Sequence, residues 1–458
     1  MINTISPVDG SVYCATQNHT EKDIKEILEL AGVAFSKWAD LSMVERKNYV
    51  TAFVNAIIDD TDEIATELTF QMGRPLSQTP WEISGFAERA NYMVSIAEEA
   101  LEPHIIEDSD AYKRWTERVP LGVLGVLSPW NYPFLTSVNA IVPALLAGNV
   151  IVLKHSFQTP QVAERYAKAA EKAGFSKGVF QILHLNHADT ALLISNPRID
   201  GVCFTGSVAG GIAVQNSLNN KFIPCGLELG GKDAAYVRAD ADLSLSVESL
   251  VDGAFFNSGQ SCCGIERIYV HADSYDQFVD AYVALTKKYK LGNPMNTDTN
   301  LGPMVKTEAA DFVRNQIAKA IESGAKSLVD ESLFAASKEG TPYLSPHVLV
   351  DVDHTMEVMT EESFGPVVGI MKVASDAEAV ALMNDSKYGL TASIWTTDVE
   401  SAAKLAPKVE AGTVFMNRCD YLDPALAWTG VKNSGRGITL SKLGFEHVTR
   451  ARSFHFRK

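Results

Sequence analysis

The sequence has little of several features that define special classes of protein. Its six cysteines are few for 458 residues, and none shows the Cys-x-x-Cys spacing of a metal site. Its 40 basic residues are outnumbered by 56 acidic ones, and the resulting net charge of -16 disfavours a nucleic-acid surface. No window approaches 18 uninterrupted apolar residues, and no basic, then apolar leader follows Met1. We therefore expect reduced thiols, no metal, no nucleic-acid or membrane partner, and a cytoplasmic protein.

The composition is that of an ordinary globular chain. Hydrophobic residues make up 46% and charged residues 21%, and the mean hydropathy is -0.01. A chain of this length exceeds one compact core, so two or three domains are expected.

Hydrophobic periodicity divides the chain into a helical part and two α/β parts. Residues 21–105 follow the three-four spacing of helices, as at Ile24, Ile27 and Leu28. A first set of short β-rich runs then alternates with amphipathic stretches, at 123–127, 150–153, 201–205 and 234–237. A second set lies at 267–271, 348–352, 367–373, 392–395 and 413–417, with helices near 274–290 and 306–323. Strands that alternate with helices predict parallel sheets.

Two further segments have strand character outside these sets. Residues 106–119 are polar yet β-branched and aromatic in places, and residues 449–456 alternate in a similar way. We expect the two segments to pair as an excursion that meets another subunit.

A loop between regular elements carries two adjacent cysteines. The segment Gly259-Gln-Ser-Cys262-Cys263 lies between a helix-like run at 244–256 and the strand that begins near 267. Loops can present a reactive thiol, and amide dipoles or cations can activate it. Taken alone, however, two adjacent cysteines are more often small buried hydrophobes.

The usual dinucleotide fingerprint, Gly-x-Gly-x-x-Gly after a strand, does not occur in the first α/β part. Gly206-Ser-Val-Ala-Gly-Gly211 takes its place at the end of a predicted strand and opens a helix. Glycine permits a close backbone approach, and a helix N-terminus favours phosphate. By itself, this spacing is a weak signal.

The cysteine segment resembles the catalytic motif of the aldehyde dehydrogenase superfamily, and further segments resemble the motifs of that family in its order. The resemblance extends from about residue 5 to residue 458. It is carried by Pro129-Trp-Asn131-Tyr-Pro-Phe134, Leu153-Lys154, Phe204-Thr-Gly206-Ser207, Leu227-Glu228-Leu-Gly-Gly-Lys232, Gly259-Gln-Ser-Cys262, Glu361-Glu362-Ser-Phe364-Gly-Pro366 and Gly430-Val-Lys-Asn-Ser434-Gly-Arg436-Gly437.

The resemblance implies a fold of two Rossmann-like parallel α/β domains with a small β oligomerisation excursion. Residues 1–105 and 120–235 would form the cofactor-binding domain, and residues 236–430 the catalytic domain. Residues 106–119 and 438–458 would build the interface of a homodimer or a homotetramer.

The implied activity is NAD(P)-dependent oxidation of an aldehyde to a carboxylic acid. A carbonyl carbon cannot release hydride until a nucleophile adds to it, and Cys262 would be that nucleophile and then carry a thioester. Asn131 would stabilise the oxyanion, and Glu228 would activate the water that hydrolyses the thioester. Each of these two residues has an ordinary alternative: Asn131 could be a turn residue near a proline, and Glu228 could be a solvated surface acid.

The family's cofactor contacts can be carried over residue by residue. Ser207 would touch phosphate, Glu362 would hold the nicotinamide ribose, and Phe364 would pack nearby. The complete expected set is Trp130, Lys154, Ser156, Phe157, Gly206, Ser207, Gly211, Leu229, Glu362 and Phe364.

Position 157 departs from NAD-preferring relatives, which often have a glutamate there. Phe157 cannot repel a 2′-phosphate, whereas Lys154, with His155 or Ser156, could meet one. NADP is therefore mildly favoured and NAD stays open, since Phe157 could also simply block that corner.

The substrate stays open at this stage. Arg418 could bind a distal carboxylate, but Asp420 or Asp423 could neutralise it in a surface ion pair, which is the favoured interpretation. Position 139 is Asn rather than a cation, which weakens the succinic-semialdehyde option. Cys263 could tune the reactivity of its neighbour.

Three alternative functions stay open. The first is a CoA-acylating aldehyde dehydrogenase, which Glu228 disfavours, and the second is a non-catalytic protein that retains the fold. A plain cysteine hydrolase fits the sequence least.

Overall fold

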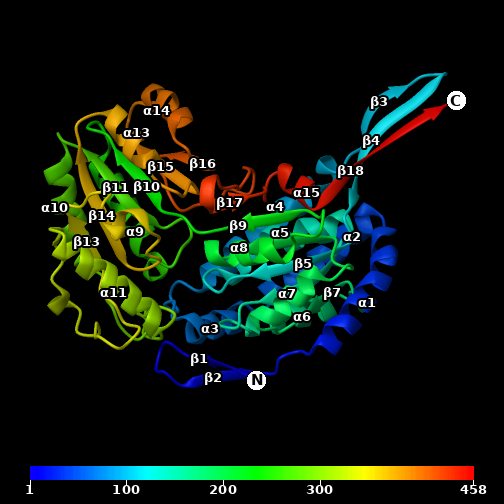
Figure 1. The fold of residues 1–458 in the computed structure, drawn as a ribbon, viewed down its shortest axis with the longest axis horizontal. Helices are drawn as coiled ribbons and strands as arrows, with labels where there is room; N and C mark the ends of the chain where they lie inside the picture. The colour runs from blue at the N-terminus through cyan, green and yellow to red at the C-terminus, as the bar shows by residue number, and fades with distance from the viewer.

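The computed structural model describes residues 1–458, which form two α/β lobes and a projecting β arm (Figure 1). The first lobe is built on a six-stranded sheet whose neighbouring strands are parallel except at one edge pair. In spatial order, its strands are β17 (Gly435–Arg436), β9 (Cys225–Glu228), β8 (Gly201–Thr205), β5 (Val123–Ser128), β6 (Val150–His155) and β7 (Phe180–Ile182).

Helices precede this sheet and lie against it. The lead-in expected from hydrophobic periodicity is confirmed as four helices, α1 (Glu21–Ala39), α2 (Met43–Ile58), α3 (Thr61–Met72) and α4 (Pro80–Ala100). Capping boxes at Thr20 and Ser42 fix the starts of the first two. The remaining helices of this lobe are α5 (Pro133–Ala147), α6 (Gln161–Lys172), α7 (His187–Ser195), α8 (Val208–Ser217) and α15 (Leu443–His447).

The second lobe is built on a seven-stranded sheet, parallel except at its β12–β13 edge. In spatial order, its strands are β12 (Lys326–Ser327), β13 (His347–Val350), β14 (Val367–Val373), β11 (Ile265–His271), β10 (Asp233–Val237), β15 (Thr391–Trp395) and β16 (Thr413–Met416). Its helices are α9 (Leu243–Phe255), α10 (Tyr275–Thr286), α11 (Thr307–Glu322), α12 (Glu357–Thr360), α13 (Asp376–Asn384) and α14 (Val399–Leu405).

The position of β10 corrects one sequence expectation. Residues 234–237 were assigned to the first set of strands, but they pair with β11 and β15 at the centre of the second sheet. The boundary expected between residues 235 and 236 would cut this strand. We therefore place the boundary in the loop at 229–232, because a sheet is the unit that packs around one core.

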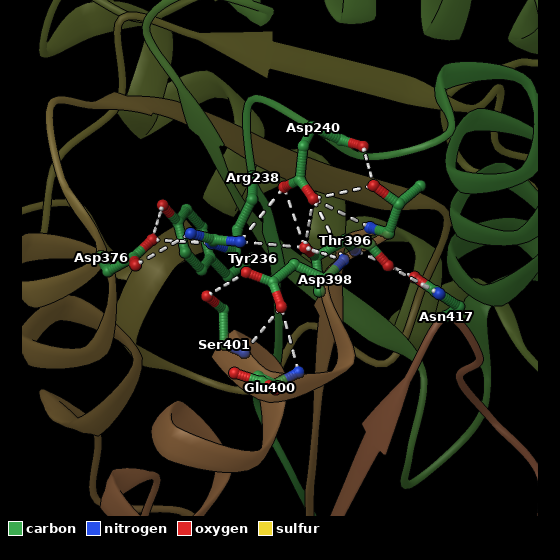
Figure 2. Close-up of polar contacts among 10 residues, drawn as sticks. Tyr236, Arg238, Asp240, Asp376, Thr396, Asp398, Glu400, Ser401 and Asn417 are labelled. Atoms are coloured by element: carbon green, nitrogen blue, oxygen red, sulfur yellow. Dashed lines mark hydrogen bonds and ion pairs between the residues drawn. The ribbon is translucent and has the colours of Figure 1, made fainter.

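A polar network closes the carboxyl-terminal edge of the second sheet (Figure 2). Arg238 follows β10 and donates to both Asp376 and Thr396, at 3.0 Å in each case. Asp240 accepts from Thr396 Oγ1 at 2.7 Å, and Asn417 accepts from Thr396 N at 2.9 Å. These side chains satisfy one another's hydrogen bonds, so the network connects the loops that follow neighbouring strands at this edge.

The arm confirms the expected pairing of two distant segments. Strands β3 (His104–Asp108), β4 (Tyr112–Pro120) and β18 (Thr449–Arg457) form an antiparallel sheet that projects from the first lobe (Figure 1). Trp115 stacks on Phe454 across it, with ring centroids 4.5 Å apart.

An N-terminal hairpin, β1 (Ile2–Ile5) with β2 (Val12–Thr16), was not foreseen. It contacts both halves of the molecule, because Thr4 donates to the carbonyl of Phe157 and Val8 accepts from Tyr343. No helix in the protein has the length and apolar character needed to cross a membrane.

Candidate active site

Two cavities meet between the lobes. One has a volume of about 380 Å³ and the other of about 400 Å³. Four residues line both of them: Thr205, Glu228, Leu229 and Cys262. Thr205 and Glu228 end strands β8 and β9 of the first sheet, while Cys262 lies just before β11 of the second. The site thus uses the carboxyl ends of one sheet and the amino end of the other.

The loop before Cys262 has an unusual backbone. Asn257, Ser258 and Gly259 have φ values of 52°, 56° and 71°, so three consecutive residues are left-handed. A Cβ on Gly259 would lie 2.3 Å from the carbonyl of Gly365, so only glycine fits there. Gln260 anchors the loop by accepting from Val305 N at 2.8 Å. This conformation presents Cys262 at the junction of the cavities.

The Cys262 thiol is not activated by a cation in this structure. The neighbouring Cys263 thiol raises its pKa well above the usual value, and burial raises it further. Both cysteines are free thiols. The sequence allowed for activation by amide dipoles or cations, but the structure shows a thiol that needs a base to remove its proton.

Asn131 lies in the loop before α5 and lines the first cavity beside Cys262. Its Nδ2 donates to the carbonyl of Gln260 at 3.1 Å, which fixes the side chain against the nucleophile loop. Arg74 donates to the backbone carbonyl of Asn131. The amide is therefore a fixed donor next to the thiol, as an oxyanion-stabilising group must be.

Glu228 is a recessed carboxyl group held by two hydroxyls. Thr439 Oγ1 donates to Oε1 at 2.6 Å, and Thr205 Oγ1 donates to Oε2 at 3.2 Å. Burial raises the pKa of Glu228, although the two threonines and Arg89 act in the opposite direction. A carboxyl with a raised pKa suits proton transfer near neutral pH.

Glu362 faces the glycine turn that follows Glu228. It accepts from Gly231 N at 2.9 Å, and a Cβ on Gly230 would lie 2.4 Å from its carboxylate. Burial raises the pKa of Glu362 to about 7. Behind it, the buried pair Lys232–Glu266 orders the backbone of Ser363 and Phe364, whose N–H groups donate to Glu266.

The first cavity brings together most of the predicted cofactor residues. Trp130 and Phe364 meet edge to face with ring centroids 5.7 Å apart. Ser207 caps α8 by accepting from Gly210 N at 3.1 Å, and the rings of Phe204 leave no room for a side chain at Gly206. The predicted residues that line this cavity are Trp130, Asn131, Gly206, Ser207, Glu228, Leu229, Cys262, Glu362 and Phe364.

Four predicted cofactor residues lie outside this cavity. Gly211 packs within α8 against Leu229, where an added Cβ would lie 2.7 Å from that side chain, so its structural role is helix packing. Lys154, Ser156 and Phe157 follow one another at the end of β6.

At the end of β6, Lys154 can act as a cation toward a phosphate, whereas His155 cannot. Lys154 forms no ion pair, and burial lowers its pKa to about 8. Phe157 is 46% exposed. His155 is 1% exposed, and burial lowers its pKa to about 3, so it cannot serve as a cation toward a phosphate. This corrects the possibility that His155 would do so.

The second cavity contains groups that the sequence did not single out. Arg89 of this cavity and Thr439, which donates to Glu228, have no recognisable pattern around them, because their roles depend on which helices and strands cross nearby. Thr205 lies within the Phe204-Thr-Gly206-Ser207 motif, but its bond to Glu228 depends on the pairing of β8 with β9. Arg418 is exposed as expected, but it forms no ion pair with Asp420 or Asp423; its guanidinium stacks 3.6 Å from the ring centroid of Tyr421.

Fold and site together define a class, namely an α/β oxidoreductase whose two lobes meet at a thiol-containing site. The sequence profile of the aldehyde dehydrogenase family matches residues 1–454. The chain belongs to the aldehyde dehydrogenase family.

Individual relatives agree with this assignment. The chain is 33% identical to an aldehyde dehydrogenase of Paenarthrobacter nicotinovorans, covering 97% of each chain. It is 33% identical to the NAD(P)+ succinate semialdehyde dehydrogenase of Escherichia coli strain K12, covering 96% of this chain and 95% of the relative. The crystal structure of a succinic semialdehyde dehydrogenase from Streptococcus pyogenes, in complex with NADP+, superposes with a TM-score of 0.95 at 29% identity and full coverage of both chains.

Proposed function

We propose that this protein oxidises an aldehyde to a carboxylic acid with NAD(P)+, using Cys262 as a covalent nucleophile. The observation that supports this most strongly is the meeting of two cavities at Cys262 and Glu228. Such an arrangement lets a cofactor approach the reacting carbon from one side and an aldehyde from the other.

The first cavity fits a nicotinamide dinucleotide. Gly206 and Ser207 open a helix whose N-terminus favours phosphate, and Glu362 offers a buried acceptor for ribose hydroxyls. Lys154 carries a half-buried ammonium group without a carboxylate partner, which suits a phosphate. The bound nicotinamide would supply the hydride acceptor.

The protein's own groups then divide the chemistry. Glu228 is the carboxylate that lines both cavities, so it can take the proton of the Cys262 thiol. The resulting thiolate adds to the carbonyl carbon, and Asn131 Nδ2 donates to the oxygen that becomes negative. After oxidation a thioester remains on Cys262. Glu228 releases the thiol proton to solvent and then accepts a proton from the water that hydrolyses the thioester; the Cys262 thiolate is the leaving group, and the carboxylic acid departs.

The proposal is tested by pre-steady-state kinetics. Cys262→Ala should abolish dehydrogenase and any esterase activity while the melting temperature is kept. Glu228→Ala should form the NAD(P)H burst more slowly, because the thiol loses its base, but with unchanged amplitude. It should also lose the steady-state rate, because deacylation becomes limiting. Substantial turnover by Cys262→Ala would refute the nucleophile, and an unchanged burst rate in Glu228→Ala would exclude Glu228 as the base for the thiol. Stimulation of the wild type by CoA would favour the acylating alternative.

We also propose that the arm of β3, β4 and β18 joins subunits into a homodimer or a homotetramer. The arm projects from the lobe, and Ile105, Ile106 and Phe456 on it are each more than half exposed. Truncation of residues 449–458 should lower the mass measured by light scattering to that of a monomer; an unchanged mass would exclude this role.

A further inference from the structure

The second cavity contains a buried cation that the proposed mechanism does not use. Arg89 lies on α4 and is 7% exposed, and it lines the cavity together with Cys262. Arg89 forms no ion pair within 4.0 Å. The nearby acids are engaged elsewhere, Glu82 with Arg74 and Glu228 with two threonine hydroxyls. A buried charge without a counter-ion is costly, so it calls for a function.

The hydrogen bonds of Arg89 leave one side of its guanidinium open. Nη1 donates to the carbonyl of Leu135 at 2.5 Å and to Asn139 Oδ1 at 3.5 Å. Nε and Nη2 donate to no protein atom, yet neither is among the buried atoms that lack a partner, so both are reachable from the cavity. An open Nε and Nη2 form the fork that binds the two oxygens of one carboxylate.

Asn139 on α5 is a second unpartnered donor at the same place. It is 2% exposed and lines the cavity, and its Nδ2 has no hydrogen-bond partner although it is buried. Its carbonyl oxygen faces the guanidinium of Arg89, which fixes the orientation of the amide. This donor is closed off from the cavity as the side chains stand, and a small shift of the Asn139 side chain would let it reach a carboxylate held by Arg89.

Arg89 is close enough to the nucleophile to limit the length of the ligand. Burial lowers the pKa of Arg89, and the acids Glu82 and Glu228 and the thiols of Cys263 and Cys262 act against this effect. Arg89 and Cys262 line one cavity of about 400 Å³, so an anion held by Arg89 lies a short chain away from the carbon that Cys262 attacks.

Of the other charged groups of this cavity, Glu228 is recessed and held by two threonine hydroxyls, and the remaining three are exposed. Arg418 is exposed, and Glu88, also exposed, accepts from Tyr421 at 2.8 Å. Asp420 is exposed as well. Water and salt screen these groups, whereas Arg89 acts in a drier interior.

We propose that Arg89 and Asn139 form a subsite for the distal carboxylate of a short aldehyde acid, so that the enzyme prefers such substrates to neutral aldehydes. This inference rests on the proposed dehydrogenase function. It assigns the cation to Arg89 rather than to Arg418, which the sequence offered only as a possible ligand, and it reverses the sequence argument that Asn139 disfavours a carboxylate. The semialdehyde dehydrogenases among the relatives are named for substrates of this kind.

The test compares two aldehydes of similar shape, succinic semialdehyde and the neutral 4-methylpentanal. We expect the wild type to favour the acid in kcat/KM. Arg89→Met should lower kcat/KM for the acid about 100-fold, chiefly by raising KM, and should leave the neutral aldehyde within about threefold. Arg89→Lys should restore part of the loss. The melting temperature of each variant reports on the α4–α5 contact.

An equilibrium measurement gives a readout that does not depend on turnover. Succinate should protect Cys262 of the wild type from iodoacetamide more strongly than the neutral succinamide does, and Arg89→Met should remove this difference. Equal losses on both aldehydes would show that Arg89 is only structural, and selective loss in Arg418→Met would assign the subsite to Arg418. If the wild type oxidises neither aldehyde, the dehydrogenase proposal itself fails; if it oxidises both equally well, only the subsite fails.

Discussion

Arg74 and Glu82 form a buried ion pair at 2.6 Å that holds the loop of Asn131. Glu82 Oε1 accepts the N–H groups of Phe134 and Leu135, both at 2.9 Å, and so caps the start of α5. Arg74 donates to the carbonyl of Asn131 and lies over the ring of Tyr132 at 4.4 Å. The pair therefore connects the helical lead-in to Asn131, the proposed oxyanion donor.

Glu82→Gln should destabilise the protein and impair catalysis together. It leaves Arg74 as a buried charge without a partner, which costs about 3–5 kcal/mol. Displacement of Asn131 should lower kcat by about 100-fold, as loss of an oxyanion donor does. Thermal unfolding and steady-state kinetics measure the two effects. Glu21→Gln, which breaks the exposed pair with Lys25, is the control and should change neither.

The fold and the candidate site differ in how much of each could be predicted from the sequence. The strand and helix runs predicted both sheets, because buried parallel strands are continuous apolar segments, and ordered motifs predicted Cys262, Glu228 and Asn131. Arg89 carries no such signal. An arginine on a helix is usually a surface group, and its burial here follows from the crossing of α4 and α5, which no local pattern encodes.

Local sequence patterns also could not predict which sheet each strand joins. The run at 234–237 has the same character as the strands before it, and only its pairing with β11 and β15 places it in the second lobe. Likewise, the hairpin of β1 and β2 is too short and too polar to stand out from a disordered terminus.

The pH dependence of turnover should report on Glu228. Burial raises its pKa, and the group must be ionised to accept a proton, so kcat should fall as the pH drops through a midpoint above the usual 4.5 for glutamate. Below that midpoint the decline approaches tenfold per pH unit. Arg89 favours the ionised form, so Arg89→Met should move the midpoint to higher pH. A pH profile that keeps this limb in Glu228→Gln would assign it to another group.

Cys263→Ala should make Cys262 more reactive. The neighbouring Cys263 thiol is the largest cause of the raised pKa of the Cys262 thiol, so its removal should increase the thiolate fraction. Alkylation by iodoacetamide at pH 8 should accelerate, by up to about tenfold for each pKa unit recovered. Mass spectrometry of the labelled peptide measures the rate, and Cys262→Ala provides the background. A slower reaction would mean that Cys263 supports the nucleophile.

NADP binding should weaken as the pH rises above the pKa of Lys154. Burial lowers the pKa of Lys154 to about 8, so the ammonium that attracts a 2′-phosphate is present below pH 8 and is lost above it. Between pH 7 and pH 9, the Kd of NADP should increase about tenfold relative to that of NAD, as calorimetry can measure. Lys154→Met should remove this difference, and its persistence would exclude Lys154 as the phosphate contact.

Phe157→Glu should shift cofactor preference toward NAD. The Phe157 side chain is 46% exposed and contacts His187 edge to face, so an acid can replace it without disturbing the core. A carboxylate at this position would repel the 2′-phosphate and accept hydrogen bonds from ribose hydroxyls, so the Kd of NADP should rise at least about tenfold relative to that of NAD. Phe222→Glu adds the same charge at a fully exposed position of the first lobe and controls for net charge. If both substitutions change the two cofactors alike, the end of β6 does not select between them, and Phe157 only covers that corner of the sheet.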